Sequence, residues 1–419
     1  MIKKLCLIIS LSVILVQFIN AQPHPASQSL LLQQSPLLQG AGSIGAAIPM
    51  EDASGFYYNP AQLGYFSREN NFSVSVLPQK TRWIPRFNFD LNFSSYSIAA
   101  GYNFKNSKRG LPLSIGVGYT HNKMDFNEML HIGPNLGFGG TYISPYDYEI
   151  FDCFSVGASY EYYLIFNLGI SVKSINSLMS NNPALERGIL KSNSTAFDFG
   201  AMITAPLSKL YFDDFNVKID NNTLIKPKVD FTLGYSLTNV GKELYYSSPA
   251  IKYALPKTAR LGYSFNFGIE LYKDAFKFNL LDYSFTAEAE NYLVEENLES
   301  GISYKNIMGD IKIGKNLIQL EDDKTVSVHR GHILRIFDTL VLISGRVYGR
   351  DDEFSGKTNG YGITSQGIFK ILNDVIDEPI VDYITEHFNL EYYNTNIYVD
   401  TLNETNLIGL VINYKGVKF

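Results

Sequence analysis

Apolar and polar residues alternate with a period of two along much of this chain. Between residues 113 and 120, for example, Leu113, Ile115, Val117 and Tyr119 alternate with Ser, Gly, Gly and Thr. Because successive side chains of a β-strand point to opposite faces, this alternation predicts strands with one apolar and one polar face. The same pattern, complete or rougher, occurs in residues 72–76, 87–93, 96–104, 154–162, 166–173, 197–203, 231–238, 261–271, 276–280, 302–305, 340–348 and 407–414.

The length and number of these segments predict a closed barrel. Many are about 9–11 residues long, which is the length that a tilted strand needs to cross a bilayer. They amount to about 14 plausible strands, and a sheet of that size would expose long edges unless it closed on itself. The polar positions are mostly Ser, Gly, Thr and Asn, which suit an enclosed lumen better than a soluble surface. We therefore predict an all-β fold, a closed antiparallel transmembrane β-barrel.

The connections between the predicted strands are polar and unequal in length. The longest are residues 122–150, 178–194, 207–228 and 241–257. Residues 370–388 differ, because their apolar positions approximate a helical stripe that Pro379 interrupts. This segment predicts a short helical insertion on one rim of the barrel.

The N-terminus has the features of a secretory signal peptide. Lys3 and Lys4 precede an apolar run, and Ala21 is a small residue at its exit. No later segment has the roughly 20 consecutive apolar residues of a transmembrane helix. Removal of residues 1–21 would leave Cys153 as the single cysteine, so no internal disulfide is expected.

Composition and the C-terminus agree with an outer-membrane location. The chain has 29 Tyr and 28 Phe, residues that favour half-buried strands and, for Tyr, the membrane boundary. The net charge of −6 lacks the basic footprint of a nucleic-acid-binding protein. The last predicted strand leads to a terminal Phe419, and this ending resembles the assembly signal of outer-membrane barrels. We expect the cell outer membrane of a Gram-negative bacterium.

The sequence gives little support for catalysis or for a cofactor. His329 and His332 are three residues apart, which on a strand sends them to opposite faces and disfavours a shared metal. No serine lies in a nucleophile-elbow pattern, although a Ser/His/acid arrangement across strands stays open. The acidic pairs 213–214, 322–323 and 351–352 are either solvated loop tips or Ca²⁺ ligands near lipopolysaccharide. We expect no enzyme, no catalytic residue, no metal site and no cofactor.

The segment after the signal carries the most specific motif. It consists of three glycines, an Asp-Ala pair and an Asn-Pro-Ala block, in the order Gly40, Gly42, Gly45, Asp52, Ala53, Asn59, Pro60 and Ala61. This order resembles the N-terminal segment of the FadL-type outer-membrane proteins. The resemblance implies a barrel of 14 strands whose N-terminal segment is a lumenal plug, or hatch. Glycine permits positive φ and close backbone approach, and proline restrains the chain, so a compact irregular segment is physically reasonable here.

Two later segments, residues 231–241 and 255–263, resemble the PorV/PorQ branch in particular. The predicted domains are therefore a signal peptide (1–21), a plug or hatch (22–67) and an outer-membrane barrel (68–419). The PorV/PorQ resemblance implies a non-enzymatic partner in surface protein export, by type IX secretion or a related machine. The alternative is a FadL-like channel for hydrophobic small molecules such as long-chain fatty acids.

The expected partners follow from these two alternatives. Both imply outer-membrane lipid and lipopolysaccharide around the barrel. The first implies a secretion translocon subunit or secreted cargo, and the second a hydrophobic ligand. Within the plug, we expect Asn59, Pro60 and Asp52 to hold the segment in the lumen. Asp52 should have a donor partner, either a basic side chain or backbone N–H groups.

Overall fold

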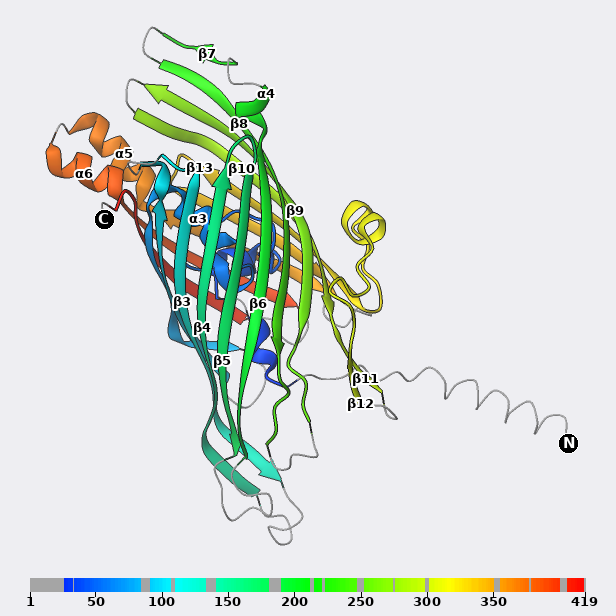
Figure 1. Ribbon diagram of the computed structural model, residues 1–419. Coiled ribbons are helices and arrows are strands. Elements are labelled where there is room, and N and C mark those ends of the chain that lie inside the picture. The colour runs from blue at the N-terminus through cyan, green and yellow to red at the C-terminus, as the bar shows by residue number, and fades with distance from the viewer. Residues whose placement is uncertain are drawn as a thin grey trace, which may run out of the picture.

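A closed ring of antiparallel strands forms the body of the protein (Figure 1). The computed structural model describes residues 26–32, 34–83, 91–106, 110–132, 141–180, 190–211, 215–220, 223–246, 252–273, 276–297, 301–349, 355–376, 378–399 and 405–417. The strands of the ring are β1 (Phe72–Trp83), β2 (Leu91–Asn103), β3 (Leu113–Ile132), β4 (Thr141–Glu161), β5 (Ile165–Ser180), β6 (Leu190–Pro206), β8 (Thr223–Gly241), β9 (Thr258–Lys273), β10 (Phe276–Tyr292), β13 (Val326–Ile336), β14 (Leu340–Tyr348), β15 (Gly356–Thr364), β16 (Phe388–Val399) and β17 (Thr405–Tyr414).

Neighbouring strands of the ring pair in antiparallel register, and two pairings close it. β1 pairs with β17, and β6 pairs directly with β8. The short β7 (Val217–Lys218) lies between β6 and β8 in the sequence and pairs with the start of β8, outside the ring. The 15-stranded sheet without β7 leaves 14 strands in the ring. The predicted fold class, all-β with a closed barrel of 14 antiparallel strands, is confirmed.

The period of two in the sequence becomes an inner and an outer face of the wall. On β3, Ile115 and Val117 are exposed on the outside, whereas Ser114 and Gly116 are buried on the inside. On β8, Leu233 is exposed and its neighbours Thr232 and Gly234 are buried. The outward assignment of the apolar positions is therefore confirmed, and the small polar residues line the lumen.

Several predicted boundaries were wrong. Residues 122–150 were expected to be a loop, but β3 and β4 extend through most of them and reach 20 and 21 residues. Backbone pairing maintains a hairpin even where polar residues end the alternation. β13, β15 and β16 were not predicted, because Gly, Asn, His and Arg interrupt their apolar pattern. Residues 302–305 were expected in the barrel, but β12 (Gly301–Tyr304) pairs with β11 (Val294–Asn297) in a separate hairpin.

The two ends of the barrel differ in their connections. One end, here called the turn end, has the three-residue connections 162–164 and 337–339, the start of β1 and the end of β17. The other, here called the loop end, has the long connections 242–257 and 293–325. The longer connection includes β11, β12 and a π-helical stretch, η6 (Ile313–Gln319).

The predicted rim insertion is a helical hairpin at the turn end. It consists of α5 (Ser365–Val375) and α6 (Pro379–His387), between β15 and β16 (Figure 1). Pro379 begins the second helix, where a missing N–H costs nothing, instead of interrupting one helix. Two further short helices, η4 (Phe104–Asn106) and α4 (Leu207–Tyr211), follow strands at the same end. Within the described residues, no helix has the length and apolar character needed to cross a membrane.

The N-terminal part of the chain lies inside the ring (Figure 1). It is almost entirely buried and contains only short helices, so its backbone groups need partners from the barrel wall. The predicted signal peptide, residues 1–21, lies outside the described residues. The short helices are η1 (Gln28–Leu31), α2 (Pro36–Gly40), η2 (Gly55–Tyr57), α3 (Gln62–Phe66) and η3 (Ser67–Glu69).

Candidate functional site

The N-terminal segment has two parts that contact different regions of the lumen. We call residues 26–32 the leading segment and residues 34–69 the plug core. The plug core begins with α2, where Ser35 Oγ accepts a hydrogen bond from the Leu38 N–H at 3.3 Å and Pro36 occupies the first turn. The contacts of these two parts with the wall define the candidate site.

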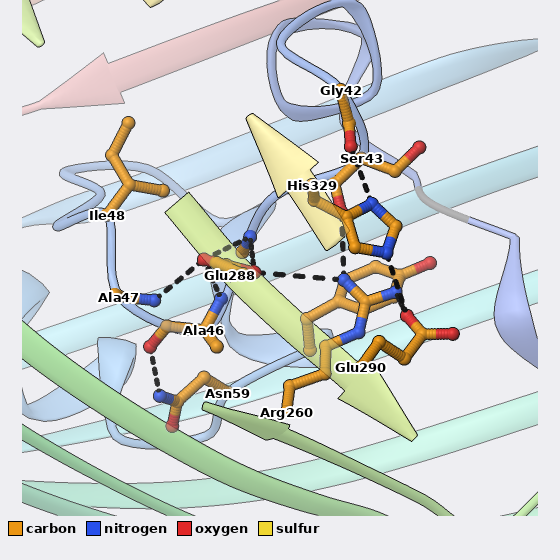
Figure 2. A network of polar contacts seen from close by, with 12 residues as sticks. Gly42, Ser43, Ala46, Ala47, Ile48, Asn59, Arg260, Glu288, Glu290 and His329 are labelled. Carbon is orange, nitrogen blue, oxygen red and sulfur yellow. Dashed lines mark hydrogen bonds and ion pairs between the residues drawn. The ribbon is translucent and has the colours of Figure 1, made fainter. Parts of the chain in front are cut away.

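A buried carboxylate holds the glycine-rich stretch of the plug core. Glu288 of β10 accepts hydrogen bonds from three consecutive backbone N–H groups, those of Gly45 (3.0 Å), Ala46 (2.8 Å) and Ala47 (2.9 Å) (Figure 2). The Glu288 side chain is fully buried. A buried carboxylate is tolerated only when donors surround it, and charge-assisted bonds of this kind are stronger than neutral ones.

Two basic side chains extend this contact along the plug. Arg260 of β9 donates from Nη1 to the Ser43 carbonyl at 2.8 Å and forms an ion pair with Glu290. His329 of β13 donates from Nδ1 to the Gly42 carbonyl at 2.7 Å, with its other ring nitrogen 3.5 Å from Glu290 (Figure 2). Three adjacent strands thus hold the plug backbone through Glu288, Arg260 and His329, here called the charged anchor.

Glycine occurs on both sides of the closest contacts between plug and wall. Gly42 has a φ of +82°, and a Cβ there would lie 2.4 Å from the Arg330 carbonyl oxygen. On the wall, a Cβ on Gly169 would lie 2.2 Å from the carbonyl carbon of Pro60. Five lumen-facing glycines stand in register on adjacent strands and give the plug backbone room to approach: Gly101, Gly116, Gly157, Gly169 and Gly200.

The Asn-Pro-Ala block and the residue after it link the later part of the plug core to its glycine-rich part. Asn59 donates from Nδ2 to the Ala46 carbonyl at 2.6 Å and accepts from the Ala61 N–H at 3.1 Å. Gln62 acts in the same way, accepting from the Met50 N–H at 3.0 Å and donating to the Ile48 carbonyl at 2.6 Å. These amides satisfy backbone groups that have no sheet or helix partner.

The remaining motif residues are held by hydroxyl groups. Thr358 of β15 donates to the Gly40 carbonyl at 2.6 Å and accepts from the Gly42 N–H at 2.9 Å. The Ala53 N–H donates to Ser73 Oγ at 3.0 Å. Asp52 accepts from the Ser54 N–H at 2.7 Å and from its hydroxyl, so the donors expected for Asp52 come from the backbone and a serine. Burial raises the pKa of Asp52.

A second buried ion pair lies on β5 and β6, which β8 separates from the strands of the charged anchor. Lys173 of β5 is 2.9 Å from Asp198 of β6, and both side chains are almost completely buried. The Lys173 ammonium also donates to Asn239 Oδ1 at 2.9 Å and lies 4.1 Å from the centre of the Tyr57 ring, an aromatic residue of the plug core. Asn239 in turn donates to the Pro256 carbonyl at 3.1 Å.

The two later sequence motifs therefore meet at the plug. Asn239 belongs to residues 231–241, and Pro256 and Arg260 belong to residues 255–263. In the first motif, Asn239 accepts a hydrogen bond from Lys173, which contacts the plug core. The second motif supplies Arg260 of the charged anchor. Their resemblance to other barrels is thus accompanied by a local role in this chain.

The leading segment lies among apolar side chains at the loop end. Leu30 packs in a buried cluster with Phe151, Ile175 and Leu244. Leu32 packs against a second cluster, on β1, β2, β3, β16 and β17. The members of that second cluster, all inward-facing, are Leu77, Phe93, Met124, Ile397 and Leu407.

The polar contacts of the leading segment are fewer than those of the plug core. The hydroxyl groups of Ser27 and Ser29 donate to the buried Glu149 of β4, the first at 2.8 Å. The Tyr57 and Tyr58 hydroxyl groups of the plug core donate to the carbonyls of Leu30 and Leu31, respectively. No basic side chain among the described residues takes part in these four contacts.

The turn end of the lumen is charged and contains open space. A cavity of about 290 Å³ is lined by Glu51, Arg68, Lys228 and Lys277, among others, and a second of about 170 Å³ shares Glu51 and Lys228 with it. Beyond β17, Lys415 lies 2.9 Å from Glu51, and its positive charge lowers the pKa of that carboxyl to about 2.

The motif residues were named from the sequence, but their wall partners were not. Glu288, Arg260 and His329 were not predicted as site residues, although a signal was present. Glu288 and Glu290 alternate on one strand and so face the same side, and two carboxylates that stand so close need donors nearby. His329 and His332 do lie on opposite faces as expected, with His332 outside beside Tyr283.

The expectations about metals concern residues that the structure describes only in part. The pairs 213–214 and 351–352 lie outside the described residues. Asp323 is within 3.4 Å of both Lys312 and Lys315, so its charge is met by lysines. In the described part of the chain, no cluster of three or more His, Cys, Asp or Glu side chains has a metal-binding arrangement.

Similar proteins were found only among solved structures. No protein-family model matches the chain, and no curated protein matches it either. The toluene transporter TodX of Pseudomonas putida is 10% identical, with 91% of this chain and 98% of that chain covered and a TM-score of 0.40. The monoaromatic hydrocarbon channel CymD is 12% identical, with 93% and 99% covered and a TM-score of 0.36. A FadL homologue of Pseudomonas aeruginosa is 8% identical, with 92% and 98% covered and a TM-score of 0.34.

Proposed function

We propose that this chain is a Gram-negative outer-membrane channel in which the leading segment and plug core close the lumen and gate the uptake of small hydrophobic molecules. This is the FadL-like alternative raised by the sequence. The observation that carries it is the apolar lining of the loop-end half of the lumen, where Leu30 and Leu32 of the leading segment pack. Sites for small hydrophobic molecules are mostly apolar, whereas a lumen that conducts water or ions is lined by polar groups.

The outer wall supports the membrane location. Leu168 and Ile170 on β5 are 64% and 58% exposed, and they belong to a broad belt of exposed apolar residues around the barrel. In water such a belt would drive aggregation, whereas hydrocarbon chains accommodate it. Outer-membrane barrels have short periplasmic turns and long external loops, so in this proposal the turn end faces the periplasm.

The gate follows from the position of the leading segment. A hydrophobic ligand that enters from the loop end would find its binding surface occupied by Leu30, beside Phe151 and Ile175. Ligand and leading segment therefore compete for the same apolar contacts. The polar groups that remain, chiefly Glu149 with Ser27, tie the segment down in the absence of ligand.

The test is ligand binding and uptake with paired variants. For the purified protein in detergent, we expect saturable binding of a fluorescent long-chain fatty acid, strengthened several-fold by Leu30→Ala, because the competitor is weakened. Phe151→Ala should weaken binding, because it removes the shared wall. Uptake by cells that express each variant should follow the same order. Absence of fatty-acid and toluene binding by the wild-type protein, or equal effects of the two variants, would contradict the proposal.

A partner role in surface protein export, as in PorV/PorQ proteins, is the second candidate. The feature that favours it is the α5–α6 hairpin, which exposes Val375 and Ile380 at the turn end. The two sequence segments that raised this candidate contact the plug in this chain, so they fit either function. Affinity purification from native outer membranes tests it: recovery of a translocon subunit with the wild type, lost in Val375→Asn/Ile380→Asn, would support it.

A further inference from the structure

Three basic residues form a row across the outer wall of the barrel. Arg330 on β13 pairs directly with Arg346 on β14, and Arg346 pairs directly with Lys357 on β15. The three side chains are therefore at one level on adjacent strands. We call Arg330, Arg346 and Lys357 the basic row.

The side chains of the basic row point away from the lumen. The neighbouring Gly331 and Gly345 face inward against Ala41 and Gly42 of the plug core, so the alternation of the strand directs Arg330 and Arg346 outward. On β15, Thr358 faces inward and Lys357 is exposed. Arg346 is exposed as well, and Arg330 is partly covered.

The basic row has no counter-charge among the described residues. None of its members forms an ion pair there, although like charges directly opposite each other on adjacent strands are destabilising. Arg330 donates to the Leu320 carbonyl at 2.5 Å, and Arg346 donates to the Tyr348 hydroxyl at 3.0 Å. Both guanidinium groups lie near the Tyr348 ring, at 4.6 and 5.7 Å from its centre.

The level of the basic row on the wall points to lipid headgroups. β14 and β15 have nine residues each, about the length that crosses a bilayer. Arg346 is the third residue from the loop end of β14, and Lys357 is the second residue of β15 at the same end. Towards the turn end the same faces carry Leu342 and Tyr361, both exposed. The cations thus lie where the apolar belt ends.

We propose that the basic row binds the phosphate groups of lipid A, the phosphorylated glycolipid of the outer leaflet. The inference rests on the membrane orientation in the proposed function. A guanidinium can offer two parallel N–H donors to one phosphate, and a bound phosphate removes the repulsion between the aligned cations. Tyr398, the register partner of Lys357, is 44% exposed and adds an aromatic residue at the boundary, as in barrel girdles.

The test compares phosphorylated and dephosphorylated lipid A on folded protein in detergent. The variant is Arg346→Gln/Lys357→Gln, which spares Arg330 and its contact with Leu320. The matched control is Lys105→Gln/Lys218→Gln, which removes two exposed cations at the turn end. Binding is measured by native mass spectrometry, with heat-modifiable gel mobility as the check that each barrel is folded.

We expect the wild type and the control to bind bisphosphorylated lipid A at least ten-fold more tightly than the variant does. Dephosphorylated lipid A should bind all three proteins equally weakly. Equal affinity of variant and wild type for lipid A, or displacement of lipid A by an equal concentration of inorganic phosphate, would overturn the proposal. A protein that folds without detergent would instead contradict the membrane location, and hydrophobic-ligand binding tests the channel separately.

Discussion

The plug core and the leading segment lie in the same lumen but are held by different forces. The plug core is fixed by buried charges, by three backbone N–H groups on Glu288 and by glycine contacts such as that of Gly42. The leading segment depends on the apolar packing of Leu30 and on serine hydroxyls at Glu149. The first kind of contact is directional and costly to break, whereas apolar contacts can be exchanged for those of another apolar group. The proposed gate requires this difference, because in it the plug core stays in place while the leading segment is displaced.

The largest effect is expected when the charged anchor is broken. Glu288→Ala leaves three N–H groups without their buried acceptor, while Arg260 keeps its ion pair with Glu290. Loss of one partner of a buried charged contact costs about 3–5 kcal/mol. Hydrogen exchange at residues 45–47 should accelerate strongly, with the barrel strands still protected. The control is Glu295→Ala, at an exposed position on β11. Unchanged exchange at residues 45–47 would mean that the plug core is held by its packing alone.

A smaller effect is expected at Gly42, which combines a close contact with a positive φ. Gly42→Ala places a Cβ against the Arg330 carbonyl and a side chain at positive φ, and the backbone strain alone costs about 1–3 kcal/mol. Gly314→Ala is the matched control, because no atom lies within 4 Å of a Cβ there. Protease sensitivity of the plug core reports the result. Equal sensitivity of the two variants would show that the wall adjusts to the added methyl group.

Loosening the leading segment should cost still less and leave the plug core in place. Ser27→Ala removes one hydroxyl from Glu149, which keeps Ser29 and Ser177, so a loss of about 1 kcal/mol is expected. Hydrogen exchange should increase at residues 27–32 and remain unchanged at residues 45–47. Parallel increases in both stretches would contradict the independence of the two parts.

The smallest effect concerns the Glu51–Lys415 pair at the turn end and its contribution to stability at low pH. The pKa of Glu51 is lowered from 4.5 to about 2, so its pairing with Lys415 stabilises the fold above about pH 4.5 and is lost as the pH falls towards 2. Because the Glu51 side chain is 53% exposed, solvent screening limits the contribution to about 0–1 kcal/mol. Urea unfolding between pH 2 and 6 should show a slightly steeper acid loss in the wild type than in Glu51→Gln. Identical pH profiles would show that this pair makes no measurable contribution to stability.

The sequence by itself determined the barrel. Alternation is a local property, so Leu233 and Gly234 could be assigned to opposite faces of a strand before any neighbour was known. The lumenal position of residues 40–61 was predicted from a resemblance at the level of a motif, not from alternation. The helical insertion around Pro379 was also visible, because a period near 3.6 is as local as a period of two.

Only the tertiary structure decided what holds the plug and where each part of it lies. Glu288 and Gly45 are 243 residues apart, and their contact depends on the register of β10 within the ring. Pairing between consecutive strands also creates the basic row, since Arg330, Arg346 and Lys357 share a level only through two strand registers. Register is set by turn geometry and by closure of the whole sheet. No pattern within one strand records which residue of another strand will stand beside it.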